Sequence, residues 1–221
     1  MILGRRRTQA VLLDAAIDCA HRGWAVVPGA VLVREGRTWT CACGDPDCEL
    51  PGDHPVHPDW PERATTDVET IAWWWSGTRQ PALVLPTGLS FDVWDVPAPV
   101  GRMTYTLLRR STVPLGPVAV SAAGRWLFLT APSLGEPLPD LSEHWDLRHR
   151  GEGSYLVAPP SARGALGAAR WVHAPAIASR RLLGAAMVAR TLAKVAEHTS
   201  DLSALTPPEV VIPSQRNGSA W

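Results

Sequence analysis

The stretch Gly151-Glu152-Gly153-Ser154-Tyr155-Leu156-Val157-Ala158-Pro159-Pro160-Ser161 is the most informative part of the chain. Its middle, residues 154–158, has the aromatic and β-branched apolar residues of a short strand. The two prolines end the strand, because proline lacks the amide hydrogen that a sheet needs. We therefore expect a strand at 154–158 that stops at Pro159.

Other strands and helices are expected on both sides of this stretch. Short apolar runs predict strands at 24–27, 82–85, 90–96, 118–120 and 126–130, and a hairpin of 31–33 with 38–40. Apolar residues at helical spacing predict helices after a possible N-cap at Thr8, after the capping box Thr66–Glu69, over 101–110, and over about 178–198. Strands and helices mix without regular βαβ alternation, so we expect an α+β fold and not a doubly wound sheet.

The composition indicates a folded domain of ordinary size. The chain has 221 residues, 46% of them hydrophobic and 19% charged, which excludes wholesale disorder. No apolar run reaches the roughly 18 residues of a spanning helix, so we expect no membrane association. Three of the four cysteines crowd into residues 41–48, unlike a dispersed disulfide framework, and this favours a reducing cytoplasm.

Charge is distributed unevenly along the chain. The formal net charge is zero, which gives no overall electrostatic signal for nucleic acid or an anionic membrane. Residues 1–40 carry +3, residues 41–100 carry −8 and residues 101–221 carry +5. The acidic middle could hold divalent metal, although such clusters are more often solvated surface.

A loop rich in cysteine and histidine predicts a zinc site. The ligand spacing is C-x-C-x4-C-x5-H, and the ligands are Cys41, Cys43, Cys48 and His54. Three thiolates and an imidazole form a familiar closed tetrahedral set that would act as a structural staple. His57 or Asp47 could replace one ligand. The alternative is a surface loop with reduced cysteines, or a disulfide between Cys41 and Cys48.

Several pieces of the chain, in order, resemble the primase–polymerase domain of bifunctional DNA primase/polymerases, in the archaeo-eukaryotic primase superfamily. The resemblance covers roughly residues 8–175, and residues 155–161 are its most specific part. The pieces are Gly52-Asp53-His54-Pro55, Ala64-Thr65-Thr66-Asp67 with Trp73-Trp74, Pro86-Thr87-Gly88, Phe91-Asp92-Val93-Trp94-Asp95-Val96-Pro97, Gly124-Arg125-Trp126-Leu127-Phe128, Asp146-Leu147-Arg148 and the 151–161 stretch.

The resemblance implies an RRM-like catalytic sheet flanked by helices, with a zinc-knuckle insertion at 41–57. It also implies nucleotidyl transfer by two Mg²⁺ or Mn²⁺ ions, held by carboxylates on one face of a strand. We expect residues 1–175 to form this domain, 176–200 a C-terminal helix and 201–221 a flexible tail.

The catalytic positions depart from the family pattern. The acidic pair of the family aligns with Asp95 and Pro97, so the second carboxylate of the pair is missing. Asp146 retains the third carboxylate of the family pattern. Asp92 is another available acid, but residues three apart on a regular strand point to opposite faces. Asp92 could share a metal with Asp95 only across a bulge. The histidine of the family falls on Trp126. We therefore expect an active site that is degraded or rebuilt.

Three arginines near these acids could bind nucleotide phosphates: Arg125, Arg148 and Arg150. Arginine binds phosphate through two parallel hydrogen bonds. The alternative interpretation is that these are exposed surface arginines without a ligand.

The sequence thus supports two functions. The first is a DNA primase/polymerase-like protein of DNA replication or repair that binds nucleic acid or nucleoside triphosphates and works with a separate helicase or replication protein. If active, it would use metals held by Asp95 and Asp146, with Asp92 as a further candidate. The second is a catalytically degenerate module that binds nucleotide, DNA or protein.

Overall fold

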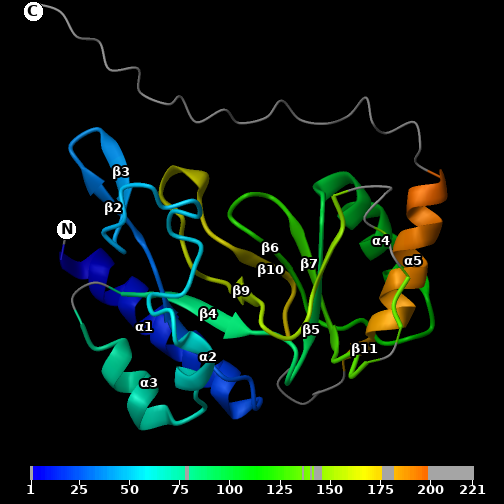
Figure 1. The fold of residues 1–221 in the computed structure, drawn as a ribbon, viewed down its shortest axis with the longest axis horizontal. Helices are drawn as coiled ribbons and strands as arrows, with labels where there is room; N and C mark the ends of the chain where they lie inside the picture. The colour runs from blue at the N-terminus through cyan, green and yellow to red at the C-terminus, as the bar shows by residue number, and fades with distance from the viewer. Residues whose placement is uncertain are drawn as a thin grey trace, which may run out of the picture.

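The computed structural model describes residues 2–77, 80–135, 137–139, 141, 146–175 and 182–198. The described residues form three sheets (Figure 1): a three-stranded sheet in the order β1-β4-β9, a six-stranded sheet containing β10-β6-β7-β5-β8 with β11 beside β7, and the hairpin β2-β3. The elements are α1 (Ile2–His21), β1 (Val27–Gly29), β2 (Leu32–Glu35), β3 (Thr38–Cys41), α2 (Trp60–Arg63), α3 (Val68–Trp74), β4 (Ala82–Pro86), β5 (Asp92–Val96), α4 (Ala98–Arg110), β6 (Val118–Val120), β7 (Trp126–Ala131), β8 (Arg148–Arg150), β9 (Tyr155–Val157), η1 (Gly164–Leu166), β10 (Arg170–His173), β11 (Leu183–Gly184) and α5 (Ala185–His198). The expected α+β class is confirmed.

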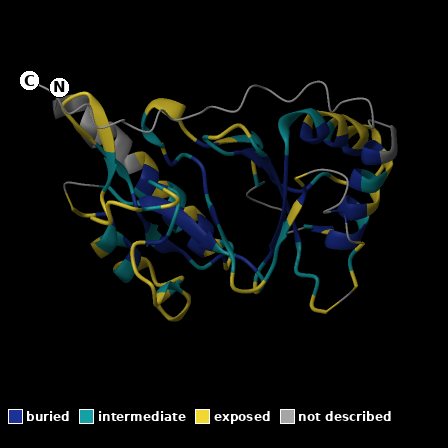
Figure 2. Ribbon diagram, turned by 45° about the horizontal axis from the view of Figure 1, so that its top comes forward, coloured by how far each residue is buried: buried dark blue, intermediate teal, exposed yellow. Residues whose placement is uncertain are grey.

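Strand β5 is an interior strand of the larger sheet, next to the edge strand β8, and all five of its residues are buried. Its neighbours are β7 and β8, both antiparallel to it. Because side chains alternate along a strand, the two faces of β5 meet different cores. Val93 belongs to the core that contains α1 residues, whereas Trp94 and Val96 pack with α5 residues such as Leu192. Figure 2 shows buried stretches along the strands and exposed residues on the outer sides of the helices.

Hydrogen bonds from the stretch between Tyr155 and Ser161 extend the pairing of β9 with β4. Leu156 and Ala158 are buried, and the Ala158 amide donates to the carbonyl of Leu83 at 2.8 Å. The Ser161 hydroxyl, also buried, accepts from the Leu83 amide at 2.8 Å. The serine thus takes over a backbone hydrogen bond where the strand has ended. The strand expected at 154–158 is confirmed over its central residues.

Helix boundaries differ from the sequence expectation in places. The first helix already begins at Ile2 and runs through Thr8, so the N-cap prediction at Thr8 is wrong. Helix α3 is capped by Asp67, whose carboxylate accepts from the Thr70 amide, and not by the Thr66–Glu69 capping box. An aspartate side chain is an equally good acceptor one position later.

The C-terminal part of the chain is described only in part. The helix expected over 178–198 is present from Ala185 to His198, after the short strand β11. Residues 176–181 and the expected tail at 201–221 lie outside the described residues. Within the described part of the chain, no helix combines the length and the apolar character needed to cross a bilayer.

Candidate functional site

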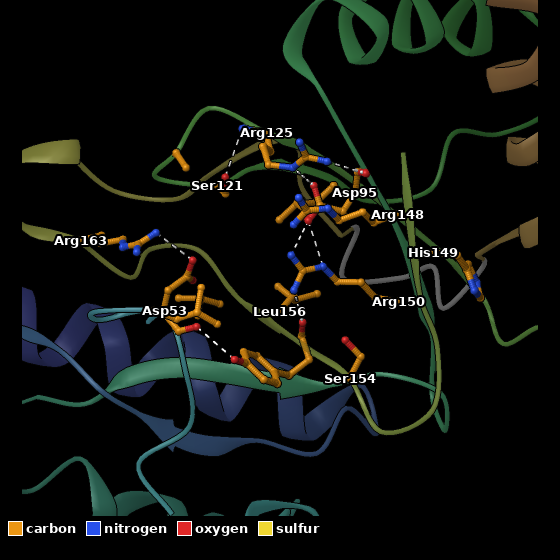
Figure 3. Close-up of a pocket in the computed structure, with 15 residues that line it drawn as sticks. Asp53, Asp95, Ser121, Arg125, Arg148, His149, Arg150, Ser154, Leu156 and Arg163 are labelled. Atoms are coloured by element: carbon orange, nitrogen blue, oxygen red, sulfur yellow. Dashed lines mark hydrogen bonds and ion pairs between the residues drawn. The ribbon is translucent and has the colours of Figure 1, made fainter. Parts of the chain in front are cut away.

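A pocket of about 490 Å³ lies where strands of both larger sheets meet the loop that contains Cys41, Cys43, Cys48 and His54, the cysteine-rich loop (Figure 3). The larger sheet contributes residues of β5, β7 and β8, the smaller sheet contributes β9, and the loop contributes Leu50 and Asp53. Its charged lining consists of Asp53, Asp95, Arg125, Arg148, Arg150 and Arg163. Four arginines against two aspartates leave the lining with a formal charge of +2. A pocket of this charge is suited to an anion.

Asp95 is the most buried charged group of the pocket, with a side chain only 1% exposed. Its Oδ1 accepts from Arg125 Nε at 2.5 Å. Its Oδ2 accepts from Arg150 Nε at 2.9 Å and from Arg150 Nη2. Burying a carboxylate is costly unless it is paired and hydrogen-bonded, and two guanidinium groups meet that need here.

Asp146 lies on the other side of Arg125. Arg125 Nη1 donates to Asp146 Oδ2 at 2.7 Å, and Arg148 Nε donates to Oδ1 at 2.7 Å. Partial burial raises the pKa of Asp146, but the guanidinium groups of Arg148 and Arg125 outweigh this and lower the pKa below its ordinary value. The guanidinium of Arg125 therefore lies between the two carboxylates that the family pattern assigns to metal.

The arrangement does not fit a pair of divalent metal ions. Every carboxylate oxygen of Asp95 and Asp146 accepts a hydrogen bond from a guanidinium group. A divalent ion at these oxygens would face three positive charges at close range. Pro97, at the position of the second family acid, has no ligand atom in its side chain.

Asp92 belongs to the opposite face of β5. The ladder between β5 and β7 is continuous from Asp92 to Val96, without a bulge, so Asp92 and Asp95 stay on different faces. Asp92 Oδ2 accepts from the Ser133 amide at 2.8 Å and lies 3.2 Å from His149 Nε2. Among the described residues, Asp92 Oδ1 is buried without a hydrogen-bond partner. The structure does not bring the two acids together.

Trp126 packs away from the pocket. It is buried in the core that contains Val96 and Phe128, and its ring lies 5.5 Å from that of Tyr105 in α4. A Cβ atom on Gly101 of α4 would lie 2.3 Å from Trp126 Cγ. A histidine at position 126 would therefore face α4 and not the pocket.

Among the pocket residues without a role in the sequence prediction, three contact one another: Asp53, Tyr155 and Arg163. Asp53 Oδ2 pairs with Arg163 Nη1 at 2.9 Å, and the Tyr155 hydroxyl donates to the carbonyl oxygen of Asp53 at 3.2 Å. The sequence signal for Asp53 and Tyr155 is their place in the motifs, since Asp53 precedes the predicted ligand His54 and Tyr155 begins the 155–161 stretch. Arg163 lies two residues beyond that stretch, outside every motif.

The four predicted metal ligands come together in the cysteine-rich loop. The ligand atoms of Cys41, Cys43, Cys48 and His54 all lie within 4.8 Å of one another. His54 Nε2 is 3.3 Å from Cys41 Sγ and 3.4 Å from Cys48 Sγ, close to the ligand separations of a tetrahedral zinc site. All four cysteines of the chain are free, so the alternative disulfide is not formed. These residues could hold a metal ion such as zinc.

The surroundings of the ligands suit a metal as well. His54 Nδ1 donates to the carbonyl oxygen of Pro55 at 2.7 Å, which leaves Nε2 free to coordinate. Burial raises the pKa of Cys41, but the amides of Cys43 and Gly52 and the imidazole of His54 outweigh it and lower the pKa to about 6.

Comparison with known proteins assigns the family. No curated protein and no solved structure matches the chain. The family described as "Bifunctional DNA primase/polymerase, N-terminal" (Prim-Pol) matches residues 16–187, which include both larger sheets, the cysteine-rich loop and the pocket. The chain therefore belongs to the bifunctional DNA primase/polymerase N-terminal (Prim-Pol) family.

Proposed function

We propose that this Prim-Pol domain binds the phosphate groups of nucleotides, free or within nucleic acid, and does not catalyse metal-dependent nucleotidyl transfer. One observation carries the proposal: the Arg125 guanidinium occupies the space between Asp95 and Asp146. The chain supplies its own cation where a polymerase would place metal. Asp92, which could have completed a metal pair, belongs to the other face of β5.

The arginines of the pocket divide into two groups. Arg125 and Arg150 hold the buried carboxylate of Asp95, and Arg150 Nη1 also donates to the Tyr155 carbonyl at 3.1 Å. Arg148 has a side chain 59% exposed, and its ion-pair partner among the described residues is the exposed Asp146, an interaction that water screens strongly. Arg148 can therefore turn to a phosphate at little cost, and Arg163 can bind it from the loop side.

The dimensions of the pocket agree with a ligand of this kind. About 490 Å³ falls within the usual range for small-molecule sites. Leucine, valine and tyrosine side chains also line the pocket and offer an apolar surface to a base or sugar. Guanidinium groups bind phosphate through paired hydrogen bonds and keep their charge at every physiological pH.

We further propose that the metal of the cysteine-rich loop is zinc and that its role is structural. Three thiolates and one imidazole form a closed ligand set without a position for substrate. Such a set requires reduced cysteines, which favours a compartment like the cytoplasm. Within a replication or repair process, the domain would deliver nucleotide or nucleic acid to a separate helicase or polymerase.

Two measurements on the zinc-loaded protein test the proposal. Isothermal titration with ATP, without added divalent metal, should show binding that weakens about 10- to 100-fold in Arg148→Ala, because charge-assisted hydrogen bonds are lost. Arg170→Ala is the matched control, since Arg170 is exposed on β10 and does not line this pocket.

Primer extension with Mn²⁺ and deoxynucleotides is the second measurement, with Asp95→Asn and Asp146→Asn beside the native protein. We expect no incorporation by any of the three. Incorporation by the native protein that both variants lose would replace the proposal by metal-dependent polymerisation. Absence of ATP binding would refute the phosphate pocket.

A further inference from the structure

We infer that the cysteine-rich metal site and the arginine pocket are coupled, so that metal at one strengthens anion binding at the other. The coupling element is the segment Pro51–His54, which contacts both sites. The inference rests on the proposed phosphate binding and adds its regulation by the metal.

The segment is tied to the metal ligands on one side. His54 is itself a ligand, and the Gly52 amide donates to Cys41 Sγ at 3.4 Å. A bound metal would therefore fix both ends of the dipeptide Gly52-Asp53. Without it, the loop at 41–50 has little apolar material to hold it, since Leu50 is half exposed.

The same segment is tied to the pocket on its other side. Arg163 Nε donates to the Pro51 carbonyl at 2.8 Å, and Arg163 Nη1 pairs with Asp53 Oδ2 at 2.9 Å. The Tyr155 hydroxyl donates to the Asp53 carbonyl at 3.2 Å. Figure 3 shows Asp53 and Arg163 facing each other across one side of the pocket. Asp53 and the metal loop thus orient the guanidinium of Arg163.

Close packing keeps the segment from moving by itself. Gly52 has φ +69°, and a Cβ atom there would lie 2.9 Å from Leu32 Cγ in the hairpin. Gly164, next to Arg163, is equally close to the hairpin, because its Cβ would lie 3.0 Å from Leu32 Cδ1. Displacing the segment therefore disturbs Arg163 as well, and an anion would bind to a less ordered pocket.

Coupling of this kind is reciprocal: the factor by which metal raises anion affinity equals the factor by which the anion raises metal affinity. Typical coupling between sites is about 5- to 150-fold, and we expect a factor of about ten, near the lower end of this range, here. Arg163 is a positioning residue in this scheme as well as a binding residue.

The first experiment measures ATP affinity by calorimetry in the zinc-loaded protein and after zinc removal, with circular dichroism to confirm that the fold persists. We expect about tenfold weaker binding without zinc. Equal affinity in both forms would overturn the coupling and leave the proposed function standing. No binding by the loaded protein would overturn both.

The second experiment uses only the folded, zinc-loaded protein, so loss of fold on zinc removal cannot confuse it. Zinc release to a chromophoric chelator is followed with and without ATP. ATP should slow release severalfold in the native protein and in Arg170→Ala, but not in Arg163→Ala or Asp53→Ala. The same ATP effect in Arg163→Ala as in the native protein would overturn the inference.

Discussion

The Nε atom of Arg125 lies 2.5 Å from Oδ1 of Asp95, whose side chain is 1% exposed. Arg125 directly precedes β7, and Asp95 pairs with Leu127 in the register of β5 and β7, so the two residues are diagonal neighbours. This register places the guanidinium at the carboxylate that a polymerase would use for metal. Several consequences of this ion pair can be measured.

Replacing Arg125 by leucine should create a divalent-cation site between Asp95 and Asp146. The substitution removes one positive charge from within hydrogen-bond distance of both carboxylates. At such distances the removal of a repulsive charge is worth several kcal/mol even with strong dielectric screening. Mn²⁺ titration followed by electron paramagnetic resonance should show binding at least tenfold tighter than in the native protein.

Two further variants make the Mn²⁺ experiment specific. Arg170→Leu removes an exposed arginine outside the pocket and should leave Mn²⁺ binding at the native level. Arg125→Leu combined with Asp146→Asn should lose most of the gain. Native-like binding in Arg125→Leu, or full retention of the gain in the double variant, would contradict the prediction.

Removing Arg150 should destabilise the fold through Asp95. Loss of the sole partner of a buried charge costs about 3–5 kcal/mol of stability. Arg150→Met should cost less than this, because Arg125 still pairs with Asp95 in the variant. Adding Asp95→Asn to Arg150→Met should recover part of the loss, because the buried charge is then absent. Urea unfolding of the two single variants and the double variant measures the interaction energy. Simple additivity would show that the pair does not matter to stability.

Local patterns were sufficient to predict the features that depend on nearby residues. The spacing of Cys41, Cys43, Cys48 and His54 predicted a cluster that the structure brings together, because a 14-residue loop can close on itself whatever the rest of the fold does. The two-residue period of a strand likewise separated Asp92 from Asp95, and the unbroken ladder of β5 keeps them apart.

Features that depend on distant residues could not be predicted in the same way. Asp53 and Arg163 are 110 residues apart in the sequence, and both lie beside residues that pack closely on Leu32 of the hairpin. Strand β8 was missed because Arg148, His149 and Arg150 show no apolar pattern. The strand exists because β5 offers it a hydrogen-bonding edge.

Ser161→Ala should destabilise the protein more than an ordinary serine substitution. The hydroxyl of Ser161 satisfies the Leu83 amide in the buried interior, and alanine would leave that donor unpaired. An unsatisfied buried group costs about 1–3 kcal/mol. Ser76→Ala is the control, because the Ser76 hydroxyl makes an exposed local hydrogen bond to Trp73. Chemical denaturation should show a change within about 0.5 kcal/mol for the control.

Asp146 should contribute a pH-dependent increment of stability. The guanidinium groups of Arg148 and Arg125 lower its pKa below the ordinary value of 3.8, so the ionised form is favoured in the folded state. The contribution is therefore fully present above the unfolded pKa and is lost as the pH falls through the lower folded pKa. The Tm difference between native protein and Asp146→Asn should be constant above about pH 5 and shrink below about pH 4.

The size of the Asp146 effect is limited by exposure. The side chain is 52% exposed, so water screens the pair and the increment should stay below about 1 kcal/mol. Salt at 1 M shortens the screening length to about 3 Å and should reduce the difference further. A Tm difference that grows as the pH falls from 5 to 3 would contradict the prediction, because it would show that Asp146 is destabilising when ionised.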